Sequence, residues 1–197
     1  TLGTDLSAGR GMADGHPTSG FGRRLVPMDT IRPLGAADAP AYAELRTIML
    51  ADTPWAFASS PEDDRGRDAE GVARSLAAGT FALFGAFTAE GSLVSVAMLM
   101  RESKLKRRHI AWIMSVYTHR EHRGRGLGER VMAMLIAASR DMGGVDSLYL
   151  GVSERAAAAR RLYERLGFVA WATERDAIRV DGVRYAETLM RMDLRAS

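Results

Sequence analysis

Residues 123–128 read Arg-Gly-Arg-Gly-Leu-Gly, and they lie between two segments of different periodicity. The preceding segment, residues 109–118, is His-Ile-Ala-Trp-Ile-Met-Ser-Val-Tyr-Thr, an apolar run typical of a buried strand. The following segment, residues 129–142, places apolar side chains at helical spacing: Val131, Met134, Leu135 and Ala138. This order predicts an anion site, because the first amides of a helix lack intrahelical partners and its dipole favours negative charge. The alternative is an ordinary turn with basic surface residues.

A second segment favours the anion site. Residues 147–168 read Ser-Leu-Tyr-Leu-Gly-Val-Ser-Glu-Arg-Ala-Ala-Ala-Ala-Arg-Arg-Leu-Tyr-Glu-Arg-Leu-Gly-Phe, a short apolar strand followed by an alanine-rich helix. With the Arg/Gly turn before it, this segment resembles the GCN5-related N-acetyltransferase (GNAT) superfamily. In that family an Arg/Gln-x-x-Gly-x-Gly/Ala loop holds the pyrophosphate of acetyl-CoA, and a Leu-Tyr-x-x-x-Gly-Phe segment follows. Residues 54–60 and 173–182 resemble a bacterial subgroup of general acetyltransferases.

The pattern along the chain predicts the element order β-α-α-β-β-β-α-β-α-β-β. The expected strands cover residues 29–33, 81–88, 93–100, 110–118, 148–152, 169–175 and 185–194. The expected helices cover residues 36–50, 68–78, 129–142 and 155–166. In the first of these helices, the spacing predicts one apolar face made of Ala39, Tyr42, Leu45, Ile48 and Met49. The resemblance implies the same mixed α/β (α+β) fold, with a mostly antiparallel sheet that splays between the central strand and the following one. We interpret residues 1–28, with their many glycines, as a flexible tail, in part a cloning remnant, before a single domain over residues 29–197.

Composition narrows the class of protein. The chain has 197 residues, 47% of them hydrophobic, and no apolar run long enough to span a membrane. The absence of cysteine excludes thiol catalysis and disulfides, and fits a cytoplasmic protein. A net charge of +3 gives little reason to expect a nucleic-acid partner. His119 and His122 lack a third ligand nearby, so we expect no metal.

The resemblance implies that acetyl-CoA is a co-substrate and assigns residues to it. The pantetheine arm is expected to lie in the splay and to pair with the backbone of Val116, Tyr117 and Thr118. The side chains of Arg123 and Arg125 are expected to add positive charge at the pyrophosphate. The pyrophosphate itself is expected on the backbone amides of the turn and first helical residues, namely Gly124, Arg125, Gly126, Leu127, Gly128 and Glu129.

The resemblance also implies a catalytic residue. Tyr163 occupies the position of the family tyrosine that lies near the sulfur of CoA, where a phenol can donate a proton to the departing thiolate. The alternative for Tyr163 is packing of its helix against the sheet. Ala156 departs from the family, which commonly has an asparagine here that hydrogen-bonds the CoA arm. This departure puts side-chain anchoring of pantetheine in doubt.

The general base stays unassigned, because the central strand contains no carboxylate. The candidates are Glu121, Glu154 and Glu187, or a water chain through Ser115 or Thr118.

For the acceptor, an arginine can pair with a carboxylate and aromatic side chains can wall an amine pocket. We therefore expect Arg46, Trp55 and Phe57 to bind it. The alternative for Trp55 and Phe57 is packing at the edge of the core. The acceptor is expected to be a small-molecule primary amine. The alternatives are a protein or peptide N-acetyltransferase, or a non-catalytic acyl-CoA-binding module. A homodimer that meets along the last strand is one expectation for the assembly.

Overall fold

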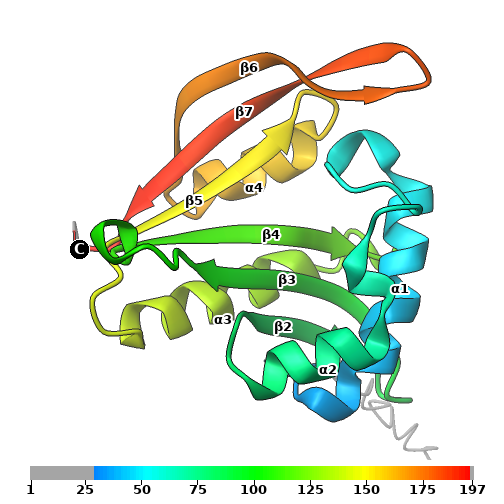
Figure 1. Ribbon diagram of the computed structural model, residues 1–197. Helices are drawn as coiled ribbons and strands as arrows, with labels where there is room; N and C mark the ends of the chain where they lie inside the picture. Colours follow the sequence, from blue (N-terminus) through cyan, green and yellow to red (C-terminus); the bar gives the residue numbers. More distant parts are fainter. Residues whose placement is uncertain (1–28, 196–197) are drawn as a thin grey trace, which may run out of the picture.

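Seven strands form one sheet in the order β1-β2-β3-β4-β5-β7-β6, described here from a computed structural model of residues 29–195 (Figure 1). The strands are β1 Thr30–Pro33, β2 Ala82–Phe87, β3 Leu93–Arg101, β4 Ile110–Thr118, β5 Ser147–Ser153, β6 Val169–Val180 and β7 Val183–Asp193. The helices are α1 Ala39–Asp52, α2 Ala69–Ala77, α3 Leu127–Asp141 and α4 Ala157–Arg165. Among the residues described, no helix combines the length and the apolar character needed to cross a bilayer.

The predicted fold class and element order are confirmed, and β4 has the predicted bounds. All strand pairs are antiparallel except β4 with β5. The last two strands are longer than expected and meet at a turn in which both Asp181 and Gly182 have positive φ. The tail expected over residues 1–28 lies outside the described residues.

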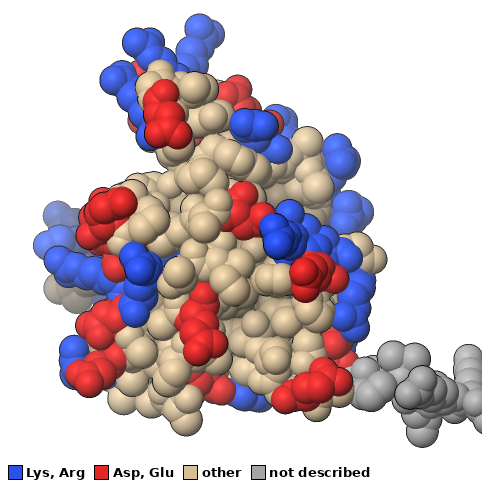
Figure 2. Space-filling model, turned by 90° about the vertical axis from the view of Figure 1, so that its right-hand side faces the viewer, with Lys and Arg blue, Asp and Glu red and all other residues tan. Residues whose placement is uncertain are grey.

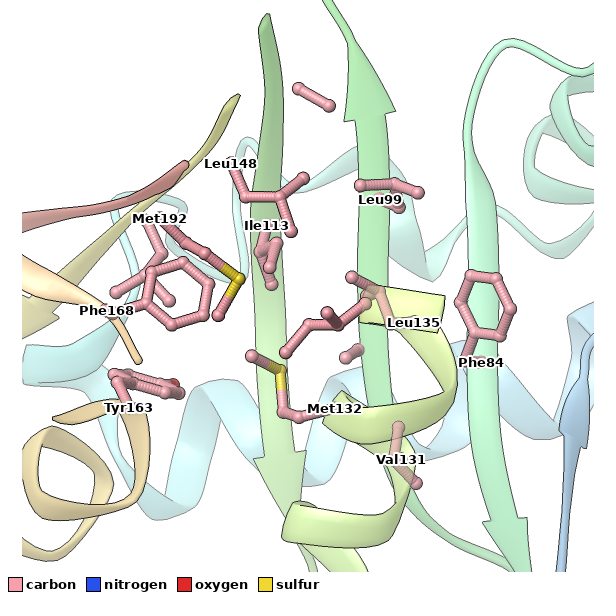
Figure 3. Close-up of a cluster of buried hydrophobic side chains, with 14 of the residues drawn as sticks. Phe84, Leu99, Ile113, Val131, Met132, Leu135, Leu148, Tyr163, Phe168 and Met192 are labelled. Carbon is pink, nitrogen blue, oxygen red and sulfur yellow. The ribbon is translucent and has the colours of Figure 1, made fainter. Parts of the chain in front are cut away.

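Two apolar clusters fill the two faces of the sheet. On one face, α3 and α4 pack onto the strands, with Met132 and Leu135 of α3 fully buried against Leu99 and Leu148 (Figure 3). On the other face, α1 and α2 cover β2 and β3 (Figure 1). Burial of apolar surface therefore holds the helices against the sheet on both of its faces.

Helix α1 corrects one detail of the predicted core. Helical spacing places Ile48 on the buried face, yet Ile48 is 42% exposed, whereas Arg46 is only 6% exposed. Arg46 tolerates burial because its guanidinium Nη2 lies 2.6 Å from Oδ2 of Asp64, in the loop that follows. Apolar periodicity alone did not reveal this paired charge.

Strands β4 and β5 pair over only three residues before they separate. Ile110 pairs with Ser147, Ala111 with Leu148, and Trp112 with Tyr149. Beyond this point β4 continues to Thr118 and β5 continues to Ser153, and β5 keeps its other partner, β7. Among the residues described, the edge of β4 that faces β5 thus has no strand partner from Ile113 onward. The splay expected from the family is present.

A β-bulge and a long hairpin shape the open end of the splay. The register between β3 and β4 shifts between Val96 and Met98, and in this part of β4 Ser115 has a φ of 53°.

The β6–β7 hairpin extends beyond the rest of the sheet (Figure 1). Figure 2 shows its tip projecting from the body with basic side chains around it, and acidic and basic side chains interspersed below. At the tip, Asp176 pairs with Arg179 and lies near Arg184.

Candidate active site

The Arg/Gly turn presents unpaired backbone amides at the start of α3. Gly124 and Gly126 have φ angles of 75° and 72°, a conformation that only glycine adopts without strain. The first intrahelical bond runs from the amide of Arg130 to the carbonyl of Gly126. Within residues 29–195, the amides of Gly124 to Glu129 donate no hydrogen bond to the protein. A run of free donors at a helix N-terminus is suited to an anion such as a pyrophosphate.

The two arginines of the turn are already paired with carboxylates. Arg123 bonds to Asp52 at the end of α1 and donates from Nε to the carbonyl of Thr118 at 3.0 Å. Arg125 lies 2.8 Å from Asp29. Their charge is therefore partly neutralised, and the backbone amides remain the main donors for an anion. The positive charge expected from these side chains stays a prediction.

Tyr117 connects the central strand to this ion pair. Its hydroxyl donates to Asp52 at 3.0 Å. Burial, together with this hydrogen bond, raises the pKa of Tyr117 to about 12. Burial by itself would raise the pKa of Asp52, but the hydrogen bonds from Tyr117 and Arg123 outweigh it and lower that pKa. The network ties the end of α1 to the turn.

Two cavities open from the splay. The first, which we name the turn cavity, has a volume of about 610 Å³ and runs along the Arg/Gly turn, the end of β4 and helix α4. The second, the sheet cavity, has a volume of about 310 Å³ and lies between β4, β5, β7 and the segment 56–59. Both are within or near the size range of small-ligand pockets. Six residues line both cavities, so these residues mark where the two meet: Ala56, Phe57, Val116, Ala156, Ala159 and Tyr163.

Tyr163 stands at the junction of the two cavities and is only 5% exposed. Its ring packs edge-on against Phe168, with 6.2 Å between the ring centroids (Figure 3). Burial raises the pKa of the Tyr163 hydroxyl well above its ordinary value. The phenol is therefore protonated at neutral pH, as a proton donor must be. Packing and proton donation are compatible at this position.

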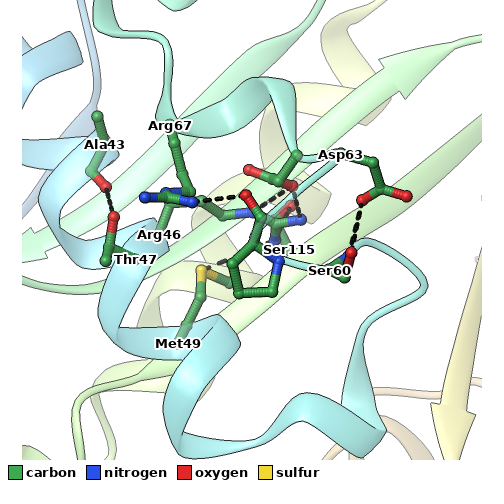
Figure 4. A network of polar contacts seen from close by, with 10 residues as sticks. Ala43, Arg46, Thr47, Met49, Ser60, Asp63, Arg67 and Ser115 are labelled. Atoms are coloured by element: carbon green, nitrogen blue, oxygen red, sulfur yellow. Dashed lines mark hydrogen bonds and ion pairs between the residues drawn. The ribbon is translucent and has the colours of Figure 1, made fainter. Parts of the chain in front are cut away.

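The predicted acceptor residues do not all line one cavity: Arg46 lines only the sheet cavity, Trp55 only the turn cavity, and Phe57 both. Arg46 and Phe57 line the sheet cavity, where the Arg46 guanidinium lies 5.2 Å from the Phe57 ring centroid. Arg46 also donates to the hydroxyl of Ser115 at 3.2 Å (Figure 4). Its charge is compensated by Asp64, which limits its use for a substrate carboxylate. The role of Arg46 and Phe57 toward an acceptor stays a prediction.

Trp55 lies on the other side, in the turn cavity. The guanidinium of Arg155 lies 5.5 Å from the Trp55 ring centroid and 5.9 Å from that of Tyr185 on β7. Arg155 therefore connects the loop after α1 with β7, across the splay. Trp55 therefore lines the cavity that includes the anion turn, and it does not line the sheet cavity with Arg46.

Glu187 of β7 is the carboxylate of the sheet cavity. A side-chain carbon added to Gly151 of β5 would collide with the Glu187 carboxyl group, so the absence of a side chain at Gly151 makes room for it. Burial raises the pKa of Glu187 above its ordinary value, and the charge of Glu174, directly opposite on β6, adds to this effect. Glu187 is one of the candidate bases in the sequence, but no sequence pattern indicates its place beside Gly151.

The raised pKa of Glu187 predicts that the wild type and the variant Glu187→Gln differ in stability by an amount that depends on pH. A carboxyl group whose pKa is higher in the folded state favours folding while it is protonated, and this contribution is lost as the pH rises through the folded pKa. We therefore expect Glu187→Gln to raise the midpoint of thermal unfolding near pH 7. Near pH 4, close to the ordinary glutamate pKa, the two proteins should melt within about 1 °C of each other. Melting curves across this pH range check the prediction, and a difference that is constant with pH contradicts it.

No metal site accompanies these residues in the part of the chain that the structure describes. No group of three or more histidine, aspartate or glutamate side chains is arranged to hold an ion there. The rings of His119 and His122 lie 5.8 Å apart, before the Arg/Gly turn.

The sequence of this chain is similar to those of known proteins. The model of the acetyltransferase (GNAT) family matches residues 42–168. The L-amino acid N-acyltransferase MnaT of Escherichia coli (strain K12) is 38% identical over 58 residues, which is 29% of this chain and 33% of that protein. The match thus spans about a third of the length of this curated relative.

Solved structures show the same fold over most of the chain. The protein yncA of Salmonella typhimurium, whose structure contains its cofactor acetyl-CoA, has a TM-score of 0.74 and 24% identity, covering 85% of this chain and 94% of that chain. The ribosomal-protein-alanine N-acetyltransferase of Brucella melitensis has a TM-score of 0.72 and 23% identity, covering 83% and 99%. The family match extends over the Arg/Gly turn and the Tyr163 helix, the two segments that build the cavities. The chain therefore belongs to the acetyltransferase (GNAT) family.

Proposed function

We propose that this protein transfers the acetyl group of acetyl-CoA to a primary amine of a small molecule. One observation carries the proposal: a turn of free backbone amides and a buried tyrosine are connected by a cavity that continues through the splay of the sheet. The amides suit a pyrophosphate, and the tyrosine suits a departing thiolate. Acetyl-CoA, when bound, supplies an acetyl group activated as a thioester.

The residues of the chain fit this donor. The amides of Gly124 to Glu129 would hold the pyrophosphate, and the unpaired edge of β4 at Val116 would hold the arm that carries the thioester. Ala156, where the family commonly has asparagine, borders both cavities and offers no side-chain hydrogen bond. Binding of the arm would therefore rest on the backbone of β4. The hydroxyl of Tyr163 would hold the proton that the sulfur takes.

The size and the lining of the sheet cavity support the proposal that the acceptor is a small molecule. Its volume of about 310 Å³ is at the lower end of the range for small-ligand sites. It is walled by Phe57 and Trp112 and contains a carboxylate, that of Glu187. An aromatic wall and a carboxylate are suited to a cationic amine. The curated relative named above is an N-acyltransferase of L-amino acids, which makes amino acids and their amides the first acceptors to test.

The proposal predicts a selective thermal shift. Saturation with acetyl-CoA or CoA at about one hundred times the dissociation constant stabilises the fold by roughly 2.7 kcal/mol. For a domain of this size the midpoint of unfolding should rise by roughly 5–10 °C. ATP, which carries phosphates but no pantetheine, should give a much smaller shift at the same concentration. Differential scanning fluorimetry with the three compounds checks this.

A screen of primary amines for thiol release from acetyl-CoA then tests the transfer. A shift with both CoA compounds and release with free amino acids or their amides support the proposed function. Release only with peptides would favour the peptide acetyltransferase. A thermal shift without turnover of any amine would favour a non-catalytic acyl-CoA-binding module, and no shift with either CoA compound contradicts the donor site.

A further inference from the structure

Within residues 29–195, Glu187 is the one carboxylate of the two cavities that has no ion-pair partner, since Glu129 pairs with Arg165. The transfer reaction needs a proton acceptor. An amine is protonated at neutral pH and has no lone pair for attack until it loses that proton. Tyr163 cannot take the proton, because its phenol is already protonated. A base must therefore come from elsewhere in the cavity walls.

The three candidate carboxylates, Glu121, Glu154 and Glu187, differ in their exposure and in their position relative to the cavities. Glu121 is exposed in the short helix Arg120–His122 and lines neither cavity. Glu154 is exposed, and its Oε1 accepts the backbone amide of Ala186 at 3.1 Å. Glu187 is half-buried and lines the sheet cavity. Only Glu187 reaches the space where an acceptor would meet the junction at Tyr163.

The hydroxyls considered for a water chain each have a polar partner already. The hydroxyl of Ser115 accepts from Arg46 at 3.2 Å, and the hydroxyl of Thr118 lies 2.8 Å from that of Ser95. A neutral hydroxyl is a much weaker base than a carboxylate. The carboxylate of Glu187 is therefore the better group in the sheet cavity to take a proton.

We propose that Glu187 is the group that removes the proton from the acceptor ammonium, with the amine nitrogen placed in the sheet cavity between Glu187 and Tyr163. This inference rests on the proposed function and deepens it. A second polar group points to the same place: Ser153, the pairing partner of Glu187 on β5, lines the sheet cavity, and its hydroxyl is buried and has no hydrogen-bond partner among the described residues. A buried hydroxyl without a partner is rare and suits a ligand that supplies one.

With Glu187 and Tyr163 in these roles, the bonds and protons of the reaction balance. The Glu187 carboxylate takes one proton from the ammonium and passes it to solvent. The freed lone pair of nitrogen forms a bond to the acetyl carbonyl carbon, and the bond between that carbon and sulfur breaks with its electron pair on sulfur. The sulfur takes a proton from the Tyr163 hydroxyl, and the second proton of the nitrogen restores the phenol. The products are the N-acetyl amine, the free thiol and one proton in solvent.

The charges around Glu187 are consistent with this role. Glu174 on β6 is the negative charge that faces Glu187. Burial is the larger cause of the raised pKa of Glu187, and the charge of Glu174 raises that pKa further. Arg46, across the cavity from α1, is neutralised by Asp64. Arg155 lies over the ring of Tyr185, two residues before Glu187 on the same strand. A base with a pKa raised toward neutrality is better matched to proton transfer than an ordinary carboxylate.

Two variants remove the base in different ways. Glu187→Gln keeps the shape of the side chain and removes its charge. Gly151→Ala keeps the carboxylate but pushes it away, and the fold should tolerate the change because the colliding group is the end of a flexible side chain. Glu121→Gln is the matched control, because it removes an exposed carboxylate outside both cavities. In all three proteins the thermal shift with acetyl-CoA should equal that of the wild type.

The test is the pH dependence of kcat/KM for acetyl transfer, measured with free L-amino acids and with amino acid amides. At pH 7, Glu187→Gln should lower kcat/KM by about a hundredfold or more, and Gly151→Ala by a smaller factor. The rate of Glu187→Gln should then rise about tenfold per pH unit, because only the spontaneously neutral amine reacts. The amides, whose ammonium groups are more acidic, should lose less than the free amino acids. Glu174→Gln should move the acidic limb of the wild-type profile to lower pH.

Three outcomes overturn the role of Glu187. One is a Glu187→Gln enzyme with the wild-type rate and pH profile. Another is a rise in KM alone with an unchanged profile, which would make Glu187 a binding partner for the ammonium. The third is acetyl-CoA binding without turnover of any of these amines by the wild type, which also contradicts the proposed function. Active wild type with an unaffected Glu187→Gln contradicts the base alone.

Discussion

We expect the variant Asp64→Ala to unfold roughly 6–20 °C below the wild type. The side chains of Arg46 and Asp64 are only 8% and 3% exposed, and Asp64 Oδ2 accepts from both Nε and Nη2 of Arg46, at 3.0 and 2.6 Å. Removal of one partner leaves a buried charge without compensation, which costs about 3–5 kcal/mol. For a domain of this size, each kcal/mol lowers the midpoint by roughly 2–4 °C.

The neighbouring residue provides the control. Among the described residues, the Asp63 carboxylate accepts only from Ser60, at the surface, so Asp63→Ala should cost within about 1 kcal/mol (Figure 4). Burial by itself would raise the pKa of Asp64, but the hydrogen bonds and charge of Arg46 lower it below its usual range. The stabilisation is therefore present above about pH 4 and is lost as the pH falls further. Equal melting of the two variants at pH 7 would show that the buried pair contributes little.

Replacing Tyr163 with phenylalanine should lower kcat about a hundredfold to a thousandfold without weakening acetyl-CoA binding. The substitution removes only the hydroxyl, and the ring keeps its edge-on contact with Phe168. Proton transfer by a positioned side chain contributes about two to four powers of ten to a rate. Single-turnover measurement of acetyl transfer separates this effect from binding.

Tyr149→Phe is the matched control for Tyr163→Phe. Tyr149 lies on β5 against Trp112, with 5.4 Å between the ring centroids, and lines neither cavity. Its loss of a hydroxyl should leave kcat within about twofold of the wild type. If Tyr163→Phe also keeps the wild-type kcat, its hydroxyl donates no proton in the rate-limiting step and the residue serves packing alone.

Local patterns predicted the fold well where one face of an element is uniformly apolar. The bounds of β4 follow from its apolar run, and the positive φ angles of Gly124 and Gly126 agree with the turn that the Arg/Gly sequence predicts. The pattern failed at Ile48 because Arg46 takes a buried position with a partner from the loop after α1. An arginine on an apolar helix face does indicate that a carboxylate partner is needed, but not which one.

Glu187 illustrates why part of the site could not be predicted. Its place in the sheet cavity depends on the registers of β7 with β5 and with β6, and on the lack of a side chain at Gly151. These pairings join residues far apart in sequence. The partners of the turn arginines, Asp29 and Asp52, depend on tertiary structure in the same way. Residues in a contiguous motif were predictable, whereas residues brought together by strand register were not.

The short pairing of β4 with β5 has a consequence for association with other chains. An unpaired strand edge at the rim of a sheet is a template on which a second polypeptide can add, and natural proteins protect such edges. Here the unpaired edge lies in the middle of the sheet, because β5 turns away after Tyr149 and stays bonded to β7. The two cavities that border this edge have volumes of about 310 and 610 Å³, which suit a small ligand rather than a second strand. The protein thus retains backbone donors for a small ligand without offering that edge to aggregation.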